Sequence, residues 1–412
     1  MIYGLIGEHL GHSFSAEIHS LLGKEPYELK ELAPEEVEGF LREGDFRGIN
    51  VTIPYKQTVM PLLDEISETA REIGAVNTIA RQDGKLAGTN TDAAGLQKLL
   101  ERTGAEVRGK KVLVLGTGGT SRTAVHTVKK MGAREVIRVS RTAREGAVNY
   151  AEAAERHSDA AILINTTPCG MFPRGWECPV DLAAYPHLTA VADAVYNPLR
   201  TRLILEARKR GIPAEGGLYM LTAQAVLAAG FFRGITYPPE TTEQIYRKMI
   251  REKENMVLIG MPGSGKSTVA AALAKLTGRP VADTDRLIEE KAGKTIPEIF
   301  RNEGEAVFRQ MESEVLAEVS AHSGQIISTG GGAVLRGKNV QALKQNGRLI
   351  LLERAAEELT PTADRPLADT REKMEQLRRE REPIYRAAAD FRIALRGTPE
   401  EAAREIESRW QE

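Results

Sequence analysis

Short apolar runs alternate with helix-like stretches along most of the chain. The apolar runs end in Gly, Asn or Asp, which is typical of strands buried in a parallel sheet, whereas the intervening stretches repeat their apolar residues with helical spacing. The clearest predicted strands are residues 111–115, 136–139, 161–164, 256–259, 325–327 and 348–352. The alternation predicts an α/β fold assembled from strand–helix units, with parallel sheets.

The same pattern divides the 412 residues into three blocks. The rhythm before position 111 differs from the rhythm after it, so we expect one α/β lobe over residues 1–100 and a second over 101–250, closed by a helix near 241–251. A third domain is expected over residues 255–412. Residues 246–255 are highly charged and contain neither Pro nor Gly, which predicts a short, helical, semi-rigid connection.

Composition narrows the class of partner. Hydrophobic residues make up 42% of the chain and charged residues 27%, enough apolar material for sizeable cores. Lys and Arg (56) nearly balance Asp and Glu (57) to a net charge of -1, so no overall field favours nucleic acid or an anionic membrane. We therefore expect small-molecule partners, and no feature predicts an oligomeric state.

Cysteine usage and the amino-terminal residues point to a reducing compartment. Two cysteines, Cys169 and Cys178, with seven His, supply neither a disulfide framework nor matched ligands for a zinc site. The first residues carry no basic leader, and no run of about 18 apolar residues occurs in the sequence. The expected location is the cytoplasm.

A glycine-rich turn follows the predicted strand 111–115 and precedes a helix-like stretch at 123–130. Glycines in such a turn let backbone N–H groups approach a pyrophosphate at the helix N-terminus. The third glycine of the usual spacing is replaced by Ser121, so a plain strand-to-helix turn is the alternative. The candidate cofactor-binding residues here are Gly116, Thr117, Gly118, Gly119 and Thr120.

The end of the next strand bears on the choice of cofactor. A ribose 2′-hydroxyl is usually held by an acid about 20 residues after the glycine turn, whereas a 2′-phosphate needs positive charge. This strand has no such acid, and it ends in Ser140, Arg141, Thr142 and Arg144. The sequence therefore predicts NADP(H) over NAD, with a solvated basic loop as the alternative.

Four polar clusters stand out in the first lobe, at residues 13–15, 50–56, 75–78 and 88–92. Ser13 and Ser15 face the same way if their segment is extended. Each cluster also has an ordinary explanation, because Asp92 could cap a helix and Asn residues favour turns. Together they offer a lysine, a carboxylate and several amides ahead of a cofactor domain.

The third block opens with a P-loop. Residues 260–267 match G-x-x-x-x-G-K-[ST] between a predicted strand and a helix-like stretch at 268–274. In this motif backbone amides wrap the phosphates, Lys266 reaches the outer phosphate oxygens and Ser267 coordinates Mg²⁺. ATP and Mg²⁺ are therefore the expected ligands, and the candidate nucleotide-binding residues are Gly263, Ser264, Gly265, Lys266, Ser267 and Thr268.

Further charged residues follow the P-loop. Asp283 and Asp285 are expected at the end of a strand, with both carboxylates on one side. Residues 330–332 are three glycines, and single arginines occur at positions 309, 365, 381 and 396. Taken individually, these arginines also fit helix surfaces and the glycines fit a loop.

The first 250 residues resemble shikimate dehydrogenases. The motifs that carry the resemblance are NVTIPYK, GAVNT, GTNTDAAG, GTGGTSR, SRTAR, INTTPCGM, DAVYNPLRT and GLYMLTAQA. The resemblance implies a substrate-binding lobe, a Rossmann-like lobe, and reduction of 3-dehydroshikimate to shikimate with NADPH. It assigns proton transfer at the C3 oxygen to Lys56 with Asp92, cofactor contact to Gly217, and substrate contacts to Ser13, Ser15, Thr52, Asn77, Asn90, Tyr196 and Gln224. His9 and Ala16 replace prolines common in that family.

Residues 255–412 resemble shikimate kinases. The resemblance implies transfer of the ATP γ-phosphoryl group to the 3-hydroxyl of shikimate. Asp285 would hold or deprotonate that hydroxyl, and Asp283 would support Mg²⁺ through water. The remaining implied roles are pairing with the substrate carboxylate by Arg309, Arg381 and Gly331, transition-state contact by the lid residue Arg365, and nucleotide contact by Arg396. The lid segment, residues 353–364, is shorter and more acidic than is usual in that family.

The sequence thus predicts a bifunctional enzyme that runs two consecutive steps. One alternative keeps the dehydrogenase and makes the third domain a nucleotide sensor of weak catalytic power. Another has the dehydrogenase act on quinate with NAD, which Arg141 and Arg144 disfavour. A scaffold without catalysis would leave Lys56, Asp92 and Lys266 without a role.

Overall fold

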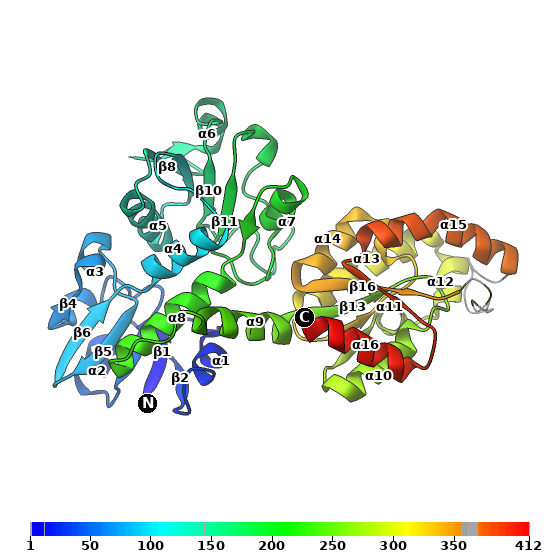
Figure 1. Cartoon of the computed structure of the whole chain (residues 1–412), viewed down its shortest axis with the longest axis horizontal. Coiled ribbons are helices and arrows are strands. Elements are labelled where there is room, and N and C mark those ends of the chain that lie inside the picture. Colours follow the sequence, from blue (N-terminus) through cyan, green and yellow to red (C-terminus); the bar gives the residue numbers. More distant parts are fainter. Residues whose placement is uncertain are drawn as a thin grey trace. The chain divides into compact units, whose positions relative to one another are not determined.

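The computed structural model describes residues 2–11, 13–143, 146–355, 357, 359 and 370–411. The chain divides into two compact units, Met1–Met249 and Ile250–Glu412 (Figure 1). The boundary between them falls inside helix α9 (Thr241–Lys253), and strand β13 (Asn255–Ile259) begins two residues after that helix ends. The prediction of a helical connection is therefore confirmed.

The first lobe of the first unit contains a mixed sheet, with the strand order β2-β1-β3-β5-β6-β4. Strands β3, β5 and β6 pair antiparallel, so the expectation of parallel sheets throughout was wrong for this lobe. The local cause is a hairpin between β5 and β6, whose turn residues Asp83 and Gly84 both have positive φ, as a type I′ turn requires. The elements are β1 (Tyr3–Gly7), α1 (Ser15–Ser20), β2 (Tyr27–Glu31), α2 (Glu36–Glu43), β3 (Gly48–Val51), η1 (Met60–Leu62), β4 (Glu65–Ile66), α3 (Glu68–Ile73), β5 (Thr78–Gln82), β6 (Lys85–Thr89) and α4 (Asp92–Arg102).

The second lobe is built on a parallel sheet with the order β12-β11-β10-β7-β8-β9. Three of its strands confirm the predictions made for residues 111–115, 136–139 and 161–164. The elements are β7 (Lys111–Leu115), α5 (Gly119–Lys130), β8 (Glu135–Ser140), β9 (Val148–Asn149), α6 (Tyr150–Arg156), β10 (Ile162–Asn165), η2 (Leu182–Ala184), β11 (Ala190–Asp193), α7 (Arg202–Lys209), β12 (Ala214–Glu215) and α8 (Leu218–Arg233).

Strand order in this sheet reverses direction between β7 and β10, because β8 and β9 extend to one side of β7 whereas β10, β11 and β12 extend to the other. In open parallel sheets such a switch point leaves a crevice at the carboxyl ends of the strands, where ligands bind. Both faces of the sheet are buried, with Leu113 and Leu115 on one face and Val112 and Val114 on the other. The uninterrupted apolar runs of the sequence follow from this double burial.

The second unit contains a five-stranded parallel sheet, ordered β14-β15-β13-β16-β17. Its central strand β13 buries Val257 and Ile259 on one face and Met256 and Leu258 on the other. The predicted strands at 256–259, 325–327 and 348–352 are confirmed. The further elements are α10 (Lys266–Thr277), β14 (Val281–Asp283), α11 (Thr284–Ala292), α12 (Ile296–Asn302), α13 (Glu305–Ala321), β15 (Ile326–Ser328), η3 (Ala333–Leu335), α14 (Gly337–Asn346), β16 (Gly347–Glu353), α15 (Arg371–Ala388), β17 (Phe391–Ala394) and α16 (Pro399–Gln411).

Two further observations concern the whole described chain. Within the described ranges, no helix combines the length and the apolar character needed to cross a membrane. Cys169 and Cys178 are both free thiols. Burial raises the pKa of the Cys169 thiol to about 11, so this side chain is poorly reactive at neutral pH.

Candidate active sites

A cleft of about 640 Å³ lies between the two lobes of the first unit. Side chains from the loops around β1, β3 and α4 form one wall, and residues that follow β10 and β11 form the other. Eight of the nine catalytic and substrate-contact residues predicted for the dehydrogenase line this cleft, together with the predicted cofactor residue Thr120: Ser13, Ser15, Thr52, Lys56, Asn77, Asp92, Tyr196 and Gln224. Segments more than 200 residues apart in the sequence are thus brought to one cavity.

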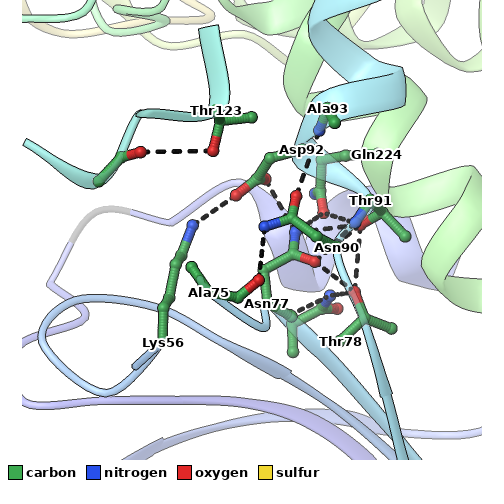
Figure 2. A network of polar contacts seen from close by, with 12 residues as sticks. Lys56, Ala75, Asn77, Thr78, Asn90, Thr91, Asp92, Ala93, Thr123 and Gln224 are labelled. Atoms are coloured by element: carbon green, nitrogen blue, oxygen red, sulfur yellow. Dashed lines mark hydrogen bonds and ion pairs between the residues drawn. The ribbon is translucent and has the colours of Figure 1, made fainter. Parts of the chain in front are cut away.

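At the centre of the cleft wall, Lys56 Nζ lies 2.6 Å from Asp92 Oδ2 (Figure 2). The two side chains keep 25% and 16% of their surface exposed, so the ion pair is accessible from the cleft yet partly desolvated. Asp92 is the first residue of α4, and the N-cap position belongs to Thr91. Its other oxygen, Oδ1, accepts from the Asn77 amide at 2.8 Å, so the carboxylate is oriented by both of its oxygens.

Asn77 is held in turn by a buried network (Figure 2). Its Oδ1 accepts from the backbone N–H of Thr91 at 2.8 Å and from the Thr78 hydroxyl at 2.9 Å. The Thr91 hydroxyl donates to Gln224 Oε1 at 3.3 Å, which ties helix α8 to this network. Because the side chains of this network are hydrogen-bonded to one another, the position of Asp92 is fixed before any ligand binds.

One prediction in this lobe needs correction. Ser15 begins helix α1, so Ser13 and Ser15 do not lie in an extended segment, and the Ser13 hydroxyl accepts from the Ser15 backbone N–H at 3.2 Å. Asn90, predicted to contact substrate, is buried; its amide donates to the Ala75 carbonyl at 2.9 Å and its Oδ1 accepts from the N–H of Ala93 at 3.3 Å at the start of α4. Its substrate contact stays a prediction.

The glycine-rich turn lies at the switch point of the second sheet, between the end of β7 and helix α5. The N-cap residue Gly118 makes no side-chain capping bond, and a Cβ at Gly118 or Gly119 would meet no atom within 4 Å. The first N–H groups of α5 are therefore open to an anion, with the helix dipole favouring negative charge. Gly116 and Thr117 precede this helix, and Thr120 in its first turn lines the cleft.

The predicted 2′-phosphate residues follow β8, the neighbour of β7. Arg141 and Thr142 are exposed, and the Ser140 hydroxyl donates to the Thr142 carbonyl, which closes the turn. Arg144 lies outside the described residues. Gly217 precedes α8 and donates its N–H to the Val195 carbonyl at 2.9 Å.

Sequence reasoning left out several residues of the cofactor-side wall. Asn50 of β3, on the opposite wall, was also left out, and the residues of the cofactor-side wall are Thr166, Thr167, Pro168, Met171 and Phe172. The last five follow β10, the strand across the switch point from β7, so strand order would have found them. The rings of Phe14 and Tyr196, from opposite lobes, contact each other in a tilted arrangement, with centroids 5.4 Å apart and planes at 55°.

In the second unit, the P-loop connects β13 to helix α10. Gly260, Gly263 and Gly265 have positive φ, a conformation that the tight turn demands and that residues with side chains rarely adopt. Gly265 caps α10 without a side-chain bond, so the first amides of the helix are open to phosphate. The Ser264 side chain is buried, so only its backbone is available to a nucleotide.

Lys266 and Ser267 start helix α10. Lys266 Nζ donates to the carbonyls of Gly260 at 3.0 Å and Met261 at 2.9 Å, which holds the lysine against its own loop. The Ser267 hydroxyl donates to Asp283 Oδ2 at 2.8 Å, so a serine and a carboxylate oxygen meet at the mouth of the P-loop. This oxygen pair fits the sparse protein ligation of Mg²⁺, which usually keeps waters and phosphate oxygens as its other ligands. Thr268, the next residue along α10, is exposed.

The two carboxylates after the P-loop, Asp283 and Asp285, were both expected at the end of a strand, and this expectation was wrong for Asp285. Strand β14 ends at Asp283, which caps helix α11 by accepting from the N–H of Arg286, whereas Asp285 lies in the first turn of that helix. Burial raises the pKa of Asp285 to about 6, although the Lys266 charge opposes this shift. A carboxylate with this pKa can take up a proton near neutral pH.

A glycine loop at residues 330–332 lies close to Asp285 and to two of the predicted arginines, Arg309 and Arg381. A Cβ on Gly330 would lie 2.5 Å from Asp285 Oδ1, and one on Gly332 would overlap the Arg309 guanidinium, so a larger residue at either position would displace these side chains. Arg381 donates to the Gly331 carbonyl at 3.1 Å. Both arginines are buried, and Arg309 forms an ion pair with Glu305 at 3.1 Å and another with Glu312 at 2.9 Å.

The structure adds Glu312 to this cluster. Its Oε2 accepts from Arg309 Nη1 at 2.9 Å, its Oε1 has no hydrogen-bond partner among the described residues, and its side chain is only 1% exposed. Burial raises the pKa of Glu312, while the charge of Arg309 opposes the shift. Its spacing of three residues from Arg309 on α13 was the available sequence signal.

A second cavity, of about 400 Å³, borders the P-loop residue Met261 and the ends of β16 and β17. Arg396 lines it, together with Tyr385 from α15. Arg365 and most of the short acidic segment assigned to the lid lie outside the described residues.

One unit joins a dinucleotide-binding sheet to a lysine-bearing cleft, and the other is built around a P-loop. The chain therefore combines an oxidoreductase with a P-loop kinase domain. Two family models match it: "Shikimate dehydrogenase substrate binding domain" over residues 5–79 and "Shikimate kinase" over residues 262–411.

Similar proteins match this chain over a longer stretch than the shikimate dehydrogenase family model does. A shikimate dehydrogenase (NADP(+)) of Clostridium perfringens is 38% identical over 266 residues, which is 60% of this chain and 98% of the relative, and one from Caldicellulosiruptor bescii is 38% identical over 250 residues, 54% of this chain and 86% of the relative. The chain belongs to the shikimate dehydrogenase family, and with its shikimate kinase domain it is a bifunctional enzyme.

Solved structures resemble the same part of the chain. A chorismate mutase/shikimate 5-dehydrogenase fusion protein from Clostridium acetobutylicum has 35% identity and a TM-score of 0.58, covering 60% of this chain and 96% of its own. Shikimate 5-dehydrogenase from Thermus thermophilus, solved in complex with NADP(H) and shikimate, has 32% identity and a TM-score of 0.54, covering 60% and 99%. Both confirm the fold of the first unit.

Proposed function

We propose that the first unit reduces 3-dehydroshikimate to shikimate with NADPH and that the second unit phosphorylates shikimate at its 3-hydroxyl with ATP. The observation that carries the first step is the ion pair of Lys56 and Asp92, 2.6 Å apart in the cleft between the substrate lobe and the dinucleotide-binding sheet. The second step rests on the glycine loop at residues 330–332, which lies against Asp285 and Arg309 and whose Gly331 carbonyl accepts from Arg381.

In the reductive step, NADPH supplies a hydride to the carbonyl carbon when it is bound. Negative charge then develops on the carbonyl oxygen, and the Lys56 ammonium donates a proton to that oxygen to form the 3-hydroxyl. Asp92 keeps Lys56 Nζ directed at the cleft, because its own position is set by Asn77. The remaining polar groups of the substrate would be contacted by Ser13, Ser15, Thr52, Asn77, Asn90, Tyr196 and Gln224.

The residues present fit NADP(H). The open amides after Gly118 suit the pyrophosphate, and the exposed Arg141, one strand away, suits a 2′-phosphate. The related Thermus thermophilus enzyme was solved with NADP(H) and shikimate, which supports the same pairing here. Arg144 would add a second charge.

In the phosphoryl-transfer step, Asp285 accepts the proton of the 3-hydroxyl as its oxygen attacks the γ-phosphorus of ATP, and ADP leaves. Arg309 and Arg381 pair with the substrate carboxylate, a bidentate interaction that selects an acid. Lys266 and the P-loop amides hold the phosphates, and Mg²⁺ would be held by Ser267, with Asp283 acting through water. Arg365 would contact the transferred group.

The chemistry of the substrate fixes the order of the two steps. The oxygen that accepts a proton from Lys56 is the oxygen that is phosphorylated in the second unit. A ketone has no hydroxyl to phosphorylate, so reduction must precede phosphoryl transfer.

The test is a coupled assay with purified protein. The protein is given 3-dehydroshikimate, NADPH, ATP and Mg²⁺, and NADPH absorbance and product mass are followed together. Loss of NADPH with appearance of shikimate 3-phosphate is expected. Accumulation of unphosphorylated shikimate would contradict the kinase step and favour the nucleotide-sensor alternative, whereas absence of NADPH oxidation would contradict the first step.

A further inference from the structure

A buried carboxylate that the proposed reaction does not use lies behind the cofactor-side wall of the cleft. Asp193 is the last residue of β11 and is fully buried. No lysine, arginine or histidine of the described chain forms an ion pair with it, and burial raises its pKa to about 7. Burying a carboxylate in this way is costly, so the residue calls for an explanation.

The contacts of Asp193 link two loops. Oδ1 accepts from the Asn165 amide at 2.9 Å and from the backbone N–H of Val195 at 3.0 Å. Oδ2 accepts from the Thr201 hydroxyl at 2.7 Å. Asn165 and Asp193 are register partners at the ends of the parallel strands β10 and β11, so the pair spans the roots of both following loops.

Asn165 extends the network into the first loop. Its Oδ1 accepts from the N–H of Thr167 at 3.0 Å and from the Thr167 hydroxyl at 2.7 Å. Thr166, Thr167 and Pro168 line the cleft. The position of this stretch of the wall therefore depends on which way the Asn165 amide faces, and Asp193 fixes that orientation.

The second loop carries Tyr196. Its root is held by the bond from Val195 N–H to Asp193, and its far end by Thr201, which also caps α7. Ala194, Val195, Tyr196 and Asn197 all line the cleft. Through three hydrogen bonds, Asp193 thus reaches both loops of the wall that faces Lys56.

We infer that Asp193 is a positioning residue of the reductase: it touches neither substrate nor cofactor and, through Asn165, Val195 and Thr201, sets the two loops that hold the dinucleotide and Tyr196 against the substrate. This inference rests on the proposed reduction. An error of about 1 Å in the placement of reacting groups can cost roughly 100-fold in rate. The three bonds therefore matter for catalysis as well as for folding.

The experiment compares two identical substitutions. Thr201→Val removes the 2.7 Å bond to Asp193, and Thr103→Val removes a buried hydroxyl that donates at 2.7 Å to the Leu100 carbonyl at the end of α4, away from the cleft. Thr201→Ser retains the hydroxyl. For each variant, kcat and KM for NADPH and 3-dehydroshikimate, binding of NADP⁺ by calorimetry, and Tm are measured.

We expect Thr201→Val to lower kcat/KM by about tenfold, with KM for NADPH raised and NADP⁺ binding weakened, and Thr201→Ser to restore both. Thr103→Val should lower Tm with the kinetic constants unchanged. Asp193→Asn, which retains an acceptor for Asn165 and Val195, should fall between Thr201→Val and the parent protein. If Thr201→Val changes only Tm, as Thr103→Val does, the positioning role is wrong. Lack of reductase activity in the parent protein would instead overturn the proposed function.

Discussion

In the cleft of the first unit, the lysine and the carboxylate contact each other directly, whereas in the second unit Lys266 donates to backbone carbonyls and Asp285 has its pKa raised by burial. Both sites combine a lysine, an aspartate and a glycine-rich turn whose backbone N–H groups are open to a ligand. They differ in how the acid–base group is prepared: Lys56 is oriented by an ion pair, and Asp285 is made more basic by desolvation. The comparison teaches that the first site depends on the contact between Lys56 and Asp92, whereas the second depends on the burial of Asp285.

The largest expected effect comes from removing the lysine of the first site. Lys56→Ala removes the group assigned to protonate the carbonyl oxygen, so kcat for NADPH oxidation should fall on the order of 10²- to 10⁴-fold. Asp92→Asn keeps the lysine and removes its charged partner, and a smaller loss is expected. Phosphorylation of added shikimate by either variant should match the parent protein. Equal and slight losses in both variants would contradict the ion-pair description.

Next in size is the loss of the base in the second site. Asp285→Asn should lower the phosphorylation rate by roughly 100-fold or more, because an amide cannot accept the hydroxyl proton, while ATP binding measured by calorimetry is unchanged. Glu290→Gln, on the same helix but exposed and paired with Arg286, is the matched control. Undiminished phosphorylation in Asp285→Asn would rule out the assigned role.

The pH profile tests desolvation itself. With a pKa of about 6 for Asp285, the phosphorylation rate should fall as the pH drops through 6, by about tenfold per pH unit below it. The effect on stability has the opposite direction. Since the folded-state pKa exceeds the unfolded value of 3.8, the native protein binds more protons between these two values, and the contribution of this group to the free energy of unfolding decreases as the pH rises through that window.

These two trends are separable by measurement on one sample. The kinase rate is recorded by product mass across the pH range, and unfolding is recorded by denaturant titration at each pH. A phosphorylation rate that stays flat down to pH 5 would show that Asp285 does not titrate near 6 in the working enzyme.

The smallest predicted effect concerns cofactor choice in the first site. Arg141→Ala should raise KM for NADPH by about tenfold and leave KM for NADH nearly unchanged, because an exposed arginine contributes mainly through the 2′-phosphate. Lys129→Ala is the control, because it removes an exposed charge at the C-terminal end of α5, away from the glycine-rich turn. A parallel rise in KM for both cofactors would mean that Arg141 supports the fold of the turn.

Local patterns predicted much of this architecture. The six clear strands, the P-loop and the helical connection to the second unit were predicted from runs and spacings of adjacent residues. The mixed sheet of the first lobe was missed, although Asp83–Gly84 between two apolar runs is a strong hairpin signal. Ser15 and Asp285 were expected in extended segments and lie in first turns of helices, because the residues that follow them set the helical pattern.

The candidate sites could be described only from the sequence and the tertiary structure together. The sequence by itself determined the groups with chemistry tied to fixed spacing, namely the P-loop and the glycine turn after β7, and the family resemblance paired Lys56 with Asp92, 36 residues further on. Tertiary structure alone decided that Asn90 supports α4, that Glu312 joins the arginine cluster, and that Asn165 and Asp193 share one network. The physical reason is that strand order and register determine which loops become neighbours, and burial determines which charges shift their pKa, and neither is encoded in adjacent residues.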